Sequence, residues 1–175
     1  MGRHWLVKVS SKEQALFWWV HRRWARHWLD RVMAALTHLG SLWSCLGIGT
    51  AMWALPTGRP LALATFLSVV TSHLPVQLLK HLVHRPRPYF VLKGYRALVT
   101  PLMDYSFPSG HTTAAFAMAG IFSSLGWPVS AVAWLLATLV GVSRMYLGHH
   151  YPLDVLTGAV IGTLASFATR AFVLA

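Results

Sequence analysis

Five long apolar segments alternate with short polar connections along the chain. The apolar segments cover residues 32–55, 61–79, 112–125, 128–142 and 155–173. An α-helix rises about 1.5 Å per residue, so the longer segments suffice to cross a hydrocarbon core about 30 Å thick. The third and fourth segments are short, and we expect further turns at their ends. The pattern therefore predicts an all-α fold, a polytopic transmembrane helical bundle of about five spans.

A basic, Trp-rich segment precedes the first apolar run. Residues 13–30, EQALFWWVHRRWARHWLD, place three arginines beside four tryptophans. So many charges are costly at a bilayer centre, whereas Trp and a basic face suit the headgroup zone. We expect an amphipathic helix at the interface, with a soluble helix on a partner domain as the alternative. The predicted division is an interfacial segment over residues 1–30 and a membrane domain over 31–175. No cleavable signal peptide is expected.

The composition supports a multi-pass protein of the cell membrane. The chain has 175 residues, 55% hydrophobic and 11% charged, with a net charge of +11, whereas soluble domains are about 25% charged. The charges flank apolar runs, so we expect anionic lipid headgroups as partners and no nucleic acid. The single Cys45 excludes a disulfide framework and is expected to be a buried small side chain.

Five spans bring three polar stretches to one face of the membrane: the N-terminal segment, residues 81–108 and residues 143–154. The first motif there is KHLVHRPRP, with Lys80 and Arg87. Arginine presents a planar fork to phosphate oxygens, and lysine supplies a point charge. We interpret Arg85 and His84 as loop residues or headgroup contacts. The alternative for the whole stretch is a basic loop that touches lipid headgroups.

The second motif is FPSGHTTAAFA. Ser109 is a good N-cap, and Gly110 lets another group approach the backbone closely. The free N–H groups and positive dipole end of a helix start favour phosphate. His111 would lie in the first turn, beside the anion. The alternative is an ordinary capped helix with a histidine at headgroup level.

The third motif is SRMYLGHHYPLD, in which Arg144 precedes His150 and Asp154. A spacing of four residues allows a helical turn to stack the histidine and the carboxylate. A carboxylate that accepts from one imidazole nitrogen fixes the tautomer and leaves the other nitrogen as a nucleophile. The competing interpretation is a metal site made of His149, His150 and Asp154. His38 and His73 lie within apolar segments, where we expect packing or channel residues.

The three motifs, in this order and spacing, resemble the type 2 phosphatidic acid phosphatase (PAP2) superfamily. The matching pattern is Lys80-x6-Arg87-Pro88, then Pro108-Ser109-Gly110-His111, then Ser143-Arg144-x5-His150-x3-Asp154. That superfamily includes membrane lipid phosphatases, glucose-6-phosphatase and vanadium haloperoxidases. The haloperoxidases are soluble, so their activity is disfavoured here. Bacterial lipid phosphatases of the family usually have six spans, and we expect this chain to have the Trp-rich segment in place of the first.

The resemblance implies a role for each motif residue. His150 would be the nucleophile that forms a phosphohistidine, and Asp154 would orient it. His111 would protonate the leaving oxygen and then activate water. The substrate phosphate would be held by Lys80, Arg87, Ser109, Gly110 and Arg144. Because fixed cations can stabilise phosphoryl transfer, no metal and no other cofactor is expected.

The predicted function is metal-independent hydrolysis of a membrane lipid phosphate or diphosphate, with undecaprenyl diphosphate as the first substrate. The alternative substrates are phosphatidylglycerophosphate and phosphatidic acid. Other hypotheses are a non-catalytic lipid-phosphate binding or transport protein and a phosphatase for a soluble ester. Thirteen of the 15 Lys and Arg residues fall on the predicted site's face, and the positive-inside rule directs that face to the cytoplasm. The resemblance to bacterial lipid phosphatases directs it outward, which is the orientation we expect.

Overall fold

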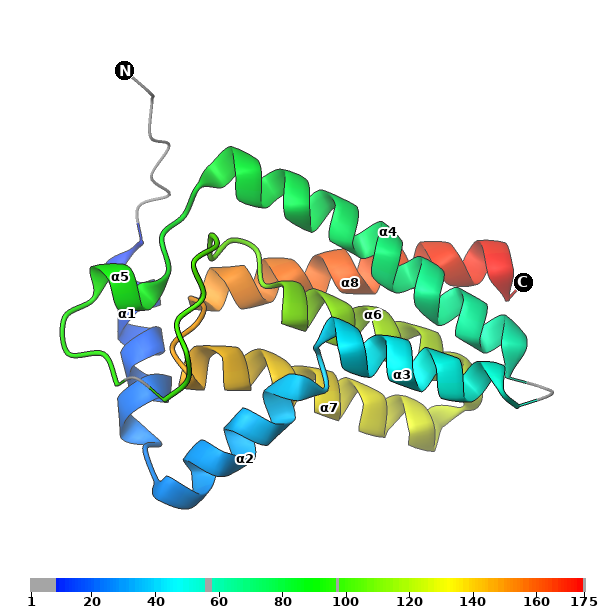
Figure 1. The fold of residues 1–175 in the computed structure, drawn as a ribbon, viewed down its shortest axis with the longest axis horizontal. Helices are drawn as coiled ribbons and strands as arrows, with labels where there is room; N and C mark the ends of the chain where they lie inside the picture. Colours follow the sequence, from blue (N-terminus) through cyan, green and yellow to red (C-terminus); the bar gives the residue numbers. More distant parts are fainter. Residues whose placement is uncertain (1–8, 56–57, 97, 175) are drawn as a thin grey trace.

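The computed structural model describes residues 9–55, 58–96 and 98–174. These residues form helices joined by loops, and no strand occurs among them. The longer helices lie side by side, with α1, α5 and the long loop gathered at one end of the bundle and the C-terminus at the other (Figure 1). In chain order the helical elements are α1 (Ser11–Trp18), a π-helical turn η1 (Trp19–Arg23), α2 (His27–His38), α3 (Leu42–Trp53), α4 (Arg59–Val83), α5 (Pro88–Val91), α6 (Gly110–Phe122), a 3-10 turn η2 (Ser123–Leu125), α7 (Trp127–Tyr146) and α8 (Pro152–Val173).

Helix α6 is the centre of the bundle, in contact with α3, α4, α7 and α8. Its sequence is rich in Ala, Gly and Thr, and most of its residues are buried. Small side chains allow close approach to α8: a Cβ on Gly120 would lie 1.8 Å from Ser166 Oγ, and one on Gly162 would lie 2.2 Å from the Thr113 carbonyl oxygen. Close packing through small residues is the usual way in which helices associate inside a bilayer.

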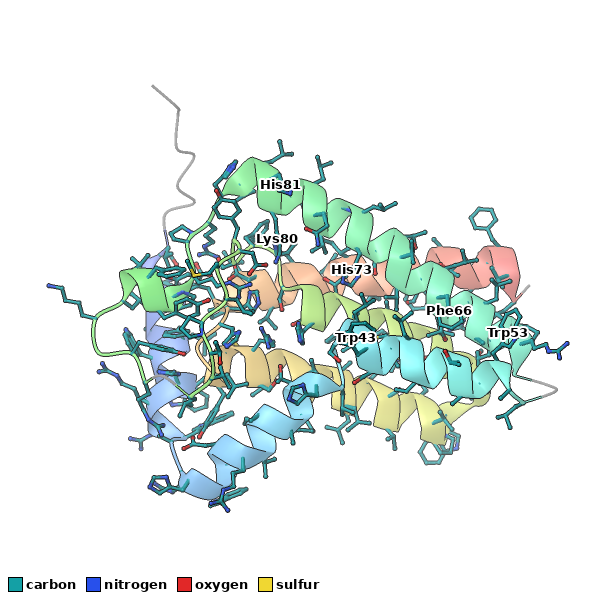
Figure 2. The ribbon with its side chains drawn as sticks, viewed as in Figure 1. Trp43, Trp53, Phe66, His73, Lys80 and His81 are labelled. Atoms are coloured by element: carbon teal, nitrogen blue, oxygen red, sulfur yellow. The ribbon has the colours of Figure 1, made fainter. Side chains whose placement is uncertain are left out.

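The outer surfaces of the long helices are apolar. Exposed large side chains include Leu74 and Leu78 on α4, Leu135 on α7 and Leu164 on α8. Figure 2 shows Phe66 between α3 and α4, where its ring meets Gly49. An apolar exterior around satisfied helical backbone is the arrangement that lipid requires.

Among the described residues, three helical segments are long and apolar enough to cross a membrane. The first is α4 together with α5, and the other two are α7 and α8. A fourth span results if the bent pair α2 and α3 is counted as one. The prediction of a multi-pass all-α membrane protein is therefore confirmed. Helix α6 has only 13 residues, about 20 Å at 1.5 Å per residue, so the five-span count stays a prediction.

The segment predicted as one span over residues 32–55 is bent by 57° between α2 and α3. Gly40 lies at the bend, where a Cβ would approach the His111 carbonyl oxygen to 2.5 Å. Ser41 then caps α3 by accepting a hydrogen bond from Ser44 N. The bend lets α2 lean over the end of the bundle while α3 runs along it (Figure 1).

The segment predicted as one helix over residues 13–30 is divided. Helix α1 passes into η1, and the chain is extended at Arg26 before α2 begins. Tyr146 holds this break, because its hydroxyl donates to Asp30 Oδ1 (2.5 Å) and accepts from Arg26 N (3.4 Å). The basic side chains stay exposed, while Val20 packs into a cluster at the end of α7.

Candidate active site

The three sequence motifs meet at one end of the bundle. Lys80 lies in the last turns of α4, the second motif begins α6, and the third links α7 to α8. The described parts of the connection from α4 to α6, residues 84–96 and 98–109, lie at this same end of the bundle (Figure 1). Lys80 and His73 lie on the side of α4 that faces the rest of the bundle (Figure 2).

Two of the predicted cations share an acidic partner that the sequence analysis did not identify. Lys80 Nζ pairs with Asp104 Oδ2, and Arg87 Nη2 donates to Asp104 Oδ1 (2.6 Å). Partial burial alone would raise the pKa of Asp104, but the charges and hydrogen bonds of Lys80 and Arg87 outweigh it and hold that pKa below its ordinary value. Asp104 is therefore a carboxylate, and it occupies the donors that we expected to face phosphate.

The second motif starts α6 as predicted. Ser109 is the N-cap, with its hydroxyl accepting from Thr112 N (3.4 Å) and lying 2.8 Å from Thr112 Oγ1. Ser109 N donates to the Asp154 carbonyl oxygen (2.9 Å), which joins the second motif to the third. Gly110 and His111 form the first turn, whose N–H groups lack intrahelical acceptors. His73 of α4 lies beside Gly110. Its Nδ1 donates to the Val69 carbonyl oxygen one turn earlier in the same helix (2.9 Å).

Arg144 is buried in the last turn of α7. Its Nη1 donates to Thr37 Oγ1 of α2 (2.7 Å), and its Nη2 donates to His149 Nδ1 (2.7 Å). A left-handed Gly148 turns the chain back so that the N–H groups of His149 and His150 both reach the Arg144 carbonyl oxygen. Two buried nitrogens, Arg144 Nε and His149 Nε2, have no partner within the described part of the chain.

His150 is held in one tautomer by a backbone carbonyl. Its Nδ1 donates to the Ser106 carbonyl oxygen (2.7 Å), since a carbonyl only accepts. The nearest oxygen of Asp154 is 3.6 Å away, too far for a hydrogen bond. Nε2 therefore carries the lone pair, which accepts a hydrogen bond from Arg87 Nη1 (3.2 Å). Burial, followed by the charges of Arg87 and Arg144, lowers the pKa of His150 well below 6.5, so the ring is neutral.

Arg85 is not a headgroup contact. Its side chain is fully buried, and it donates to Asp154 Oδ1 (2.6 Å) and to Glu13 Oε2 (2.7 Å). These partners are 69 and 72 residues away in the chain. No local pattern around RPRP indicates this pairing, so sequence reasoning missed both Arg85 and Glu13.

The side chains of the alternative metal site are engaged elsewhere. His149 Nδ1 faces Arg144, and Asp154 accepts from Arg85 and from Tyr151 N. Among residues 9–55, 58–96 and 98–174, no three His, Cys, Asp or Glu side chains are grouped as ligands for one ion. The site thus presents a neutral imidazole lone pair surrounded by Lys80, Arg87 and Arg144.

The family model of the PAP2 superfamily matches residues 59–175. Undecaprenyl-diphosphatase BcrC of Bacillus subtilis (strain 168) is 41% identical over 86 residues, which are 47% of this chain and 42% of that protein. Phosphatidylglycerophosphatase B of the same organism is 32% identical over 162 residues, covering 83% of this chain and 75% of that protein. The chain thus spans less than half of the first relative.

Solved structures agree over almost the whole chain. The crystal structure of Aquifex aeolicus LpxE superposes with a TM-score of 0.82 at 30% identity, covering 95% of this chain and 99% of that one. A PAP2-type phosphatidylglycerolphosphate phosphatase from Bacillus subtilis gives 0.75 at 30% identity, covering 93% and 87%. The chain belongs to the PAP2 superfamily.

Proposed function

We propose that the protein is an integral-membrane lipid phosphatase that acts through a phosphohistidine on His150. The observation that carries the proposal is the state of this residue. Its Nδ1–H is bound to Ser106, its ring is neutral, and its Nε2 lone pair faces Arg87. Mere binding of a phosphate requires no such nucleophile, which argues against a non-catalytic lipid-binding protein.

The proposed first step is an in-line attack of His150 Nε2 on phosphorus. The P–N bond forms while the bond from phosphorus to the leaving oxygen breaks, and protonated His111 gives that oxygen a proton. Burial and the charges of Arg144 and Arg87 lower the pKa of His111 to about 3 in the free protein, so the ring takes up this proton when the anionic phosphate binds beside it and offsets those charges. Lys80, Arg87 and Arg144 hold the equatorial oxygens, with Ser109 and the Gly110 N–H at the start of α6. Arg87 and Lys80 exchange Asp104 for phosphate, since both cations face the same space.

The second step releases phosphate. His111 removes a proton from a water molecule, whose oxygen attacks phosphorus as the P–N bond breaks. His150 returns to its neutral form, in which Nδ1 keeps its proton and donates to the Ser106 carbonyl oxygen. Asp154, 3.6 Å from Nδ1, stabilises the positive charge that the ring carries in the intermediate.

We propose undecaprenyl diphosphate as the substrate, supported by the 41% identity to BcrC. Phosphatidylglycerophosphate is the second candidate, supported by the longer alignment with phosphatidylglycerophosphatase B. The test is phosphate release by the purified protein in detergent with EDTA, comparing these two lipids with phosphatidic acid and a soluble ester. Release from one lipid that His150→Ala abolishes supports the proposal. Activity that requires a divalent ion, or an equal rate with the soluble ester, would contradict it.

We propose that the chain crosses the membrane five times, with residues 1–30 at the interface and the site facing outward. The exposed Arg22, Arg23 and Arg26 would contact anionic headgroups there. The side is tested with Lys93→Cys in a Cys45→Ala background, because Lys93 is exposed near the site. An impermeant thiol reagent should label intact cells; labelling only after lysis would reverse the orientation.

A further inference from the structure

A buried ion triad links helix α1 to the start of α8. The guanidinium of Arg85 lies between two carboxylates, donating to Asp154 Oδ1 (2.6 Å) and Glu13 Oε2 (2.7 Å). The residues are 0%, 0% and 6% exposed, respectively. The guanidinium carbon also lies 4.4 Å above the ring of Tyr151. Charges taken out of water must be paired, so this arrangement is a specific one rather than a solvated surface contact.

The two carboxylates also fasten the backbone at the start of α8. Glu13 Oε1 accepts from Leu153 N (3.2 Å), and Asp154 Oδ2 accepts from Tyr151 N (2.8 Å). These N–H groups are among those that a helix start leaves without partners. Because His150 directly precedes this turn, Glu13 helps to fix the backbone that carries the proposed nucleophile.

Arg85 contacts both groups that lie near His150 Nδ1, the Ser106 backbone and the Asp154 carboxylate. Its carbonyl oxygen accepts from Ser106 N (2.9 Å), and the Ser106 carbonyl in turn accepts from His150 Nδ1 (2.7 Å). Its side chain pairs with Asp154, which lies 3.6 Å from the same nitrogen. One buried residue thus positions the hydrogen-bond acceptor and the nearby charge.

The charge of the triad depends on Glu13. Arg85 and Asp154 alone form a neutral pair, and Arg85 would largely cancel the field of Asp154 at the imidazole. With Glu13 the cluster carries one net negative charge in a buried setting. A negative charge there favours the positive ring that forms when His150 takes up the phosphoryl group.

We propose that Glu13 is a positioning residue for the phosphoryl transfer, acting through Arg85 to keep Asp154 effective beside His150. This inference rests on the proposed function. Helix α1, which its basic and Trp-rich sequence predicts to lie at the membrane interface, would thereby also support the active site.

The test compares Glu13→Gln with Glu13→Asp. Glutamine keeps the size of the side chain and an oxygen for Leu153 N, but it removes the charge and the acceptor for Arg85. Aspartate keeps the charge and both oxygens on a shorter arm. Lys12→Gln is the matched control, since it removes an exposed charge one position away on the same helix. Steady-state kinetics and the rate of phosphoenzyme formation are measured in detergent, beside thermal unfolding of each variant.

We expect Glu13→Gln to lower kcat and the rate of phosphoenzyme formation by about tenfold, with KM within about twofold. Glu13→Asp should retain more activity than Glu13→Gln, and Lys12→Gln should match the wild type. The reverse order of the Gln and Asp variants, with kcat following thermal stability, would reduce Glu13 to a structural role and overturn the inference.

The two proposals fail in different ways. If the wild type is active, His150→Ala is inactive and Glu13→Gln equals the wild type, only the role of Glu13 is wrong. If the wild type releases no phosphate, or if His150→Ala releases it at the wild-type rate, the proposed function is wrong. The proposed role of Glu13 is then wrong as well.

Discussion

The Nδ1 of His150 is bound to the backbone carbonyl of Ser106 at 2.7 Å, whereas the carboxylate of Asp154 is 3.6 Å away. A backbone acceptor fixes the tautomer of the ring without depending on the charge of Asp154. The carboxylate is then free to pair with Arg85 and to act on the ring through its field.

Arg85 is predicted to be required for stability. Arg85→Met leaves Asp154 and Glu13 as two buried carboxylates with no counter-charge, and breaking such a buried pair costs about 3–5 kcal/mol. Thermal unfolding in detergent should show a clear loss for Arg85→Met and a smaller one for Arg85→Lys, which keeps the charge. Lys93→Met, at an exposed position, is the control. An Arg85→Met protein as stable as the control would show that the triad adds nothing to the fold.

The neutral histidines make stability depend on pH. Burial and the charges of Arg144 and Arg87 lower the pKa of His149 to about 3, and the same causes hold the pKa of His150 well below 6.5. The unfolded chain therefore binds more protons than the folded one below about pH 6.5, and stability falls as the pH falls.

As the pH falls below about 6.5, each such histidine lowers the free energy of unfolding by about 1.4 kcal/mol per pH unit. The measurement is the melting temperature of the wild type and of His150→Gln from pH 7.5 to 5.0. The variant should lose less stability over this range than the wild type. Equal slopes would mean that His150 does not resist protonation in the folded state.

Asp104 is predicted to compete with the substrate phosphate. It pairs with Lys80 and Arg87 and is itself half exposed on its side chain (51%). Asp104→Asn removes this competitor, and an ion pair whose carboxylate is half exposed is worth about 1 kcal/mol. Vanadate, a trigonal-bipyramidal phosphate mimic, should therefore inhibit the variant at roughly threefold to fivefold lower concentration. Weaker inhibition would mean that Asp104 instead holds the two cations in place.

His111 is predicted to act in both chemical steps. With a lipid substrate, His111→Ala should lower turnover by about 10²–10⁴-fold, the usual contribution of an acid–base group. With p-nitrophenyl phosphate, whose leaving group needs no proton, phosphorylation should survive and release of phosphate should become limiting. Rapid mixing should then show a burst of p-nitrophenolate. An equal loss of the burst and of the steady rate would exclude the second role.

The sequence predicted the helical membrane fold because hydropathy is a local signal. Alternating spans return the chain to the same face, and this predicted that one end of the bundle would hold Lys80, His111, Arg144, His150 and Asp154. The motifs repeat a family pattern, so these residues could be named without knowledge of their contacts.

The partners of the motif residues could not be predicted in the same way. Glu13, Arg85 and Asp104 meet their counter-charges across 17 to 72 residues, and nothing in the local composition specifies those pairs. The bend between α2 and α3 could have been predicted from the sequence, because Gly40 followed by the N-cap Ser41 is a helix-break signal. The uninterrupted apolar composition of residues 32–55 outweighed it.

The most direct test of the central claim is to trap the phosphoenzyme. The purified protein, in detergent with EDTA, is mixed with a ³²P-labelled lipid phosphate, quenched within milliseconds and digested, and the labelled peptide is identified. We predict an acid-labile, base-stable label on the peptide that contains His150, and no such label in His150→Ala. Phosphate release at the wild-type rate with no label on any peptide, or with the label elsewhere, would contradict the proposed mechanism.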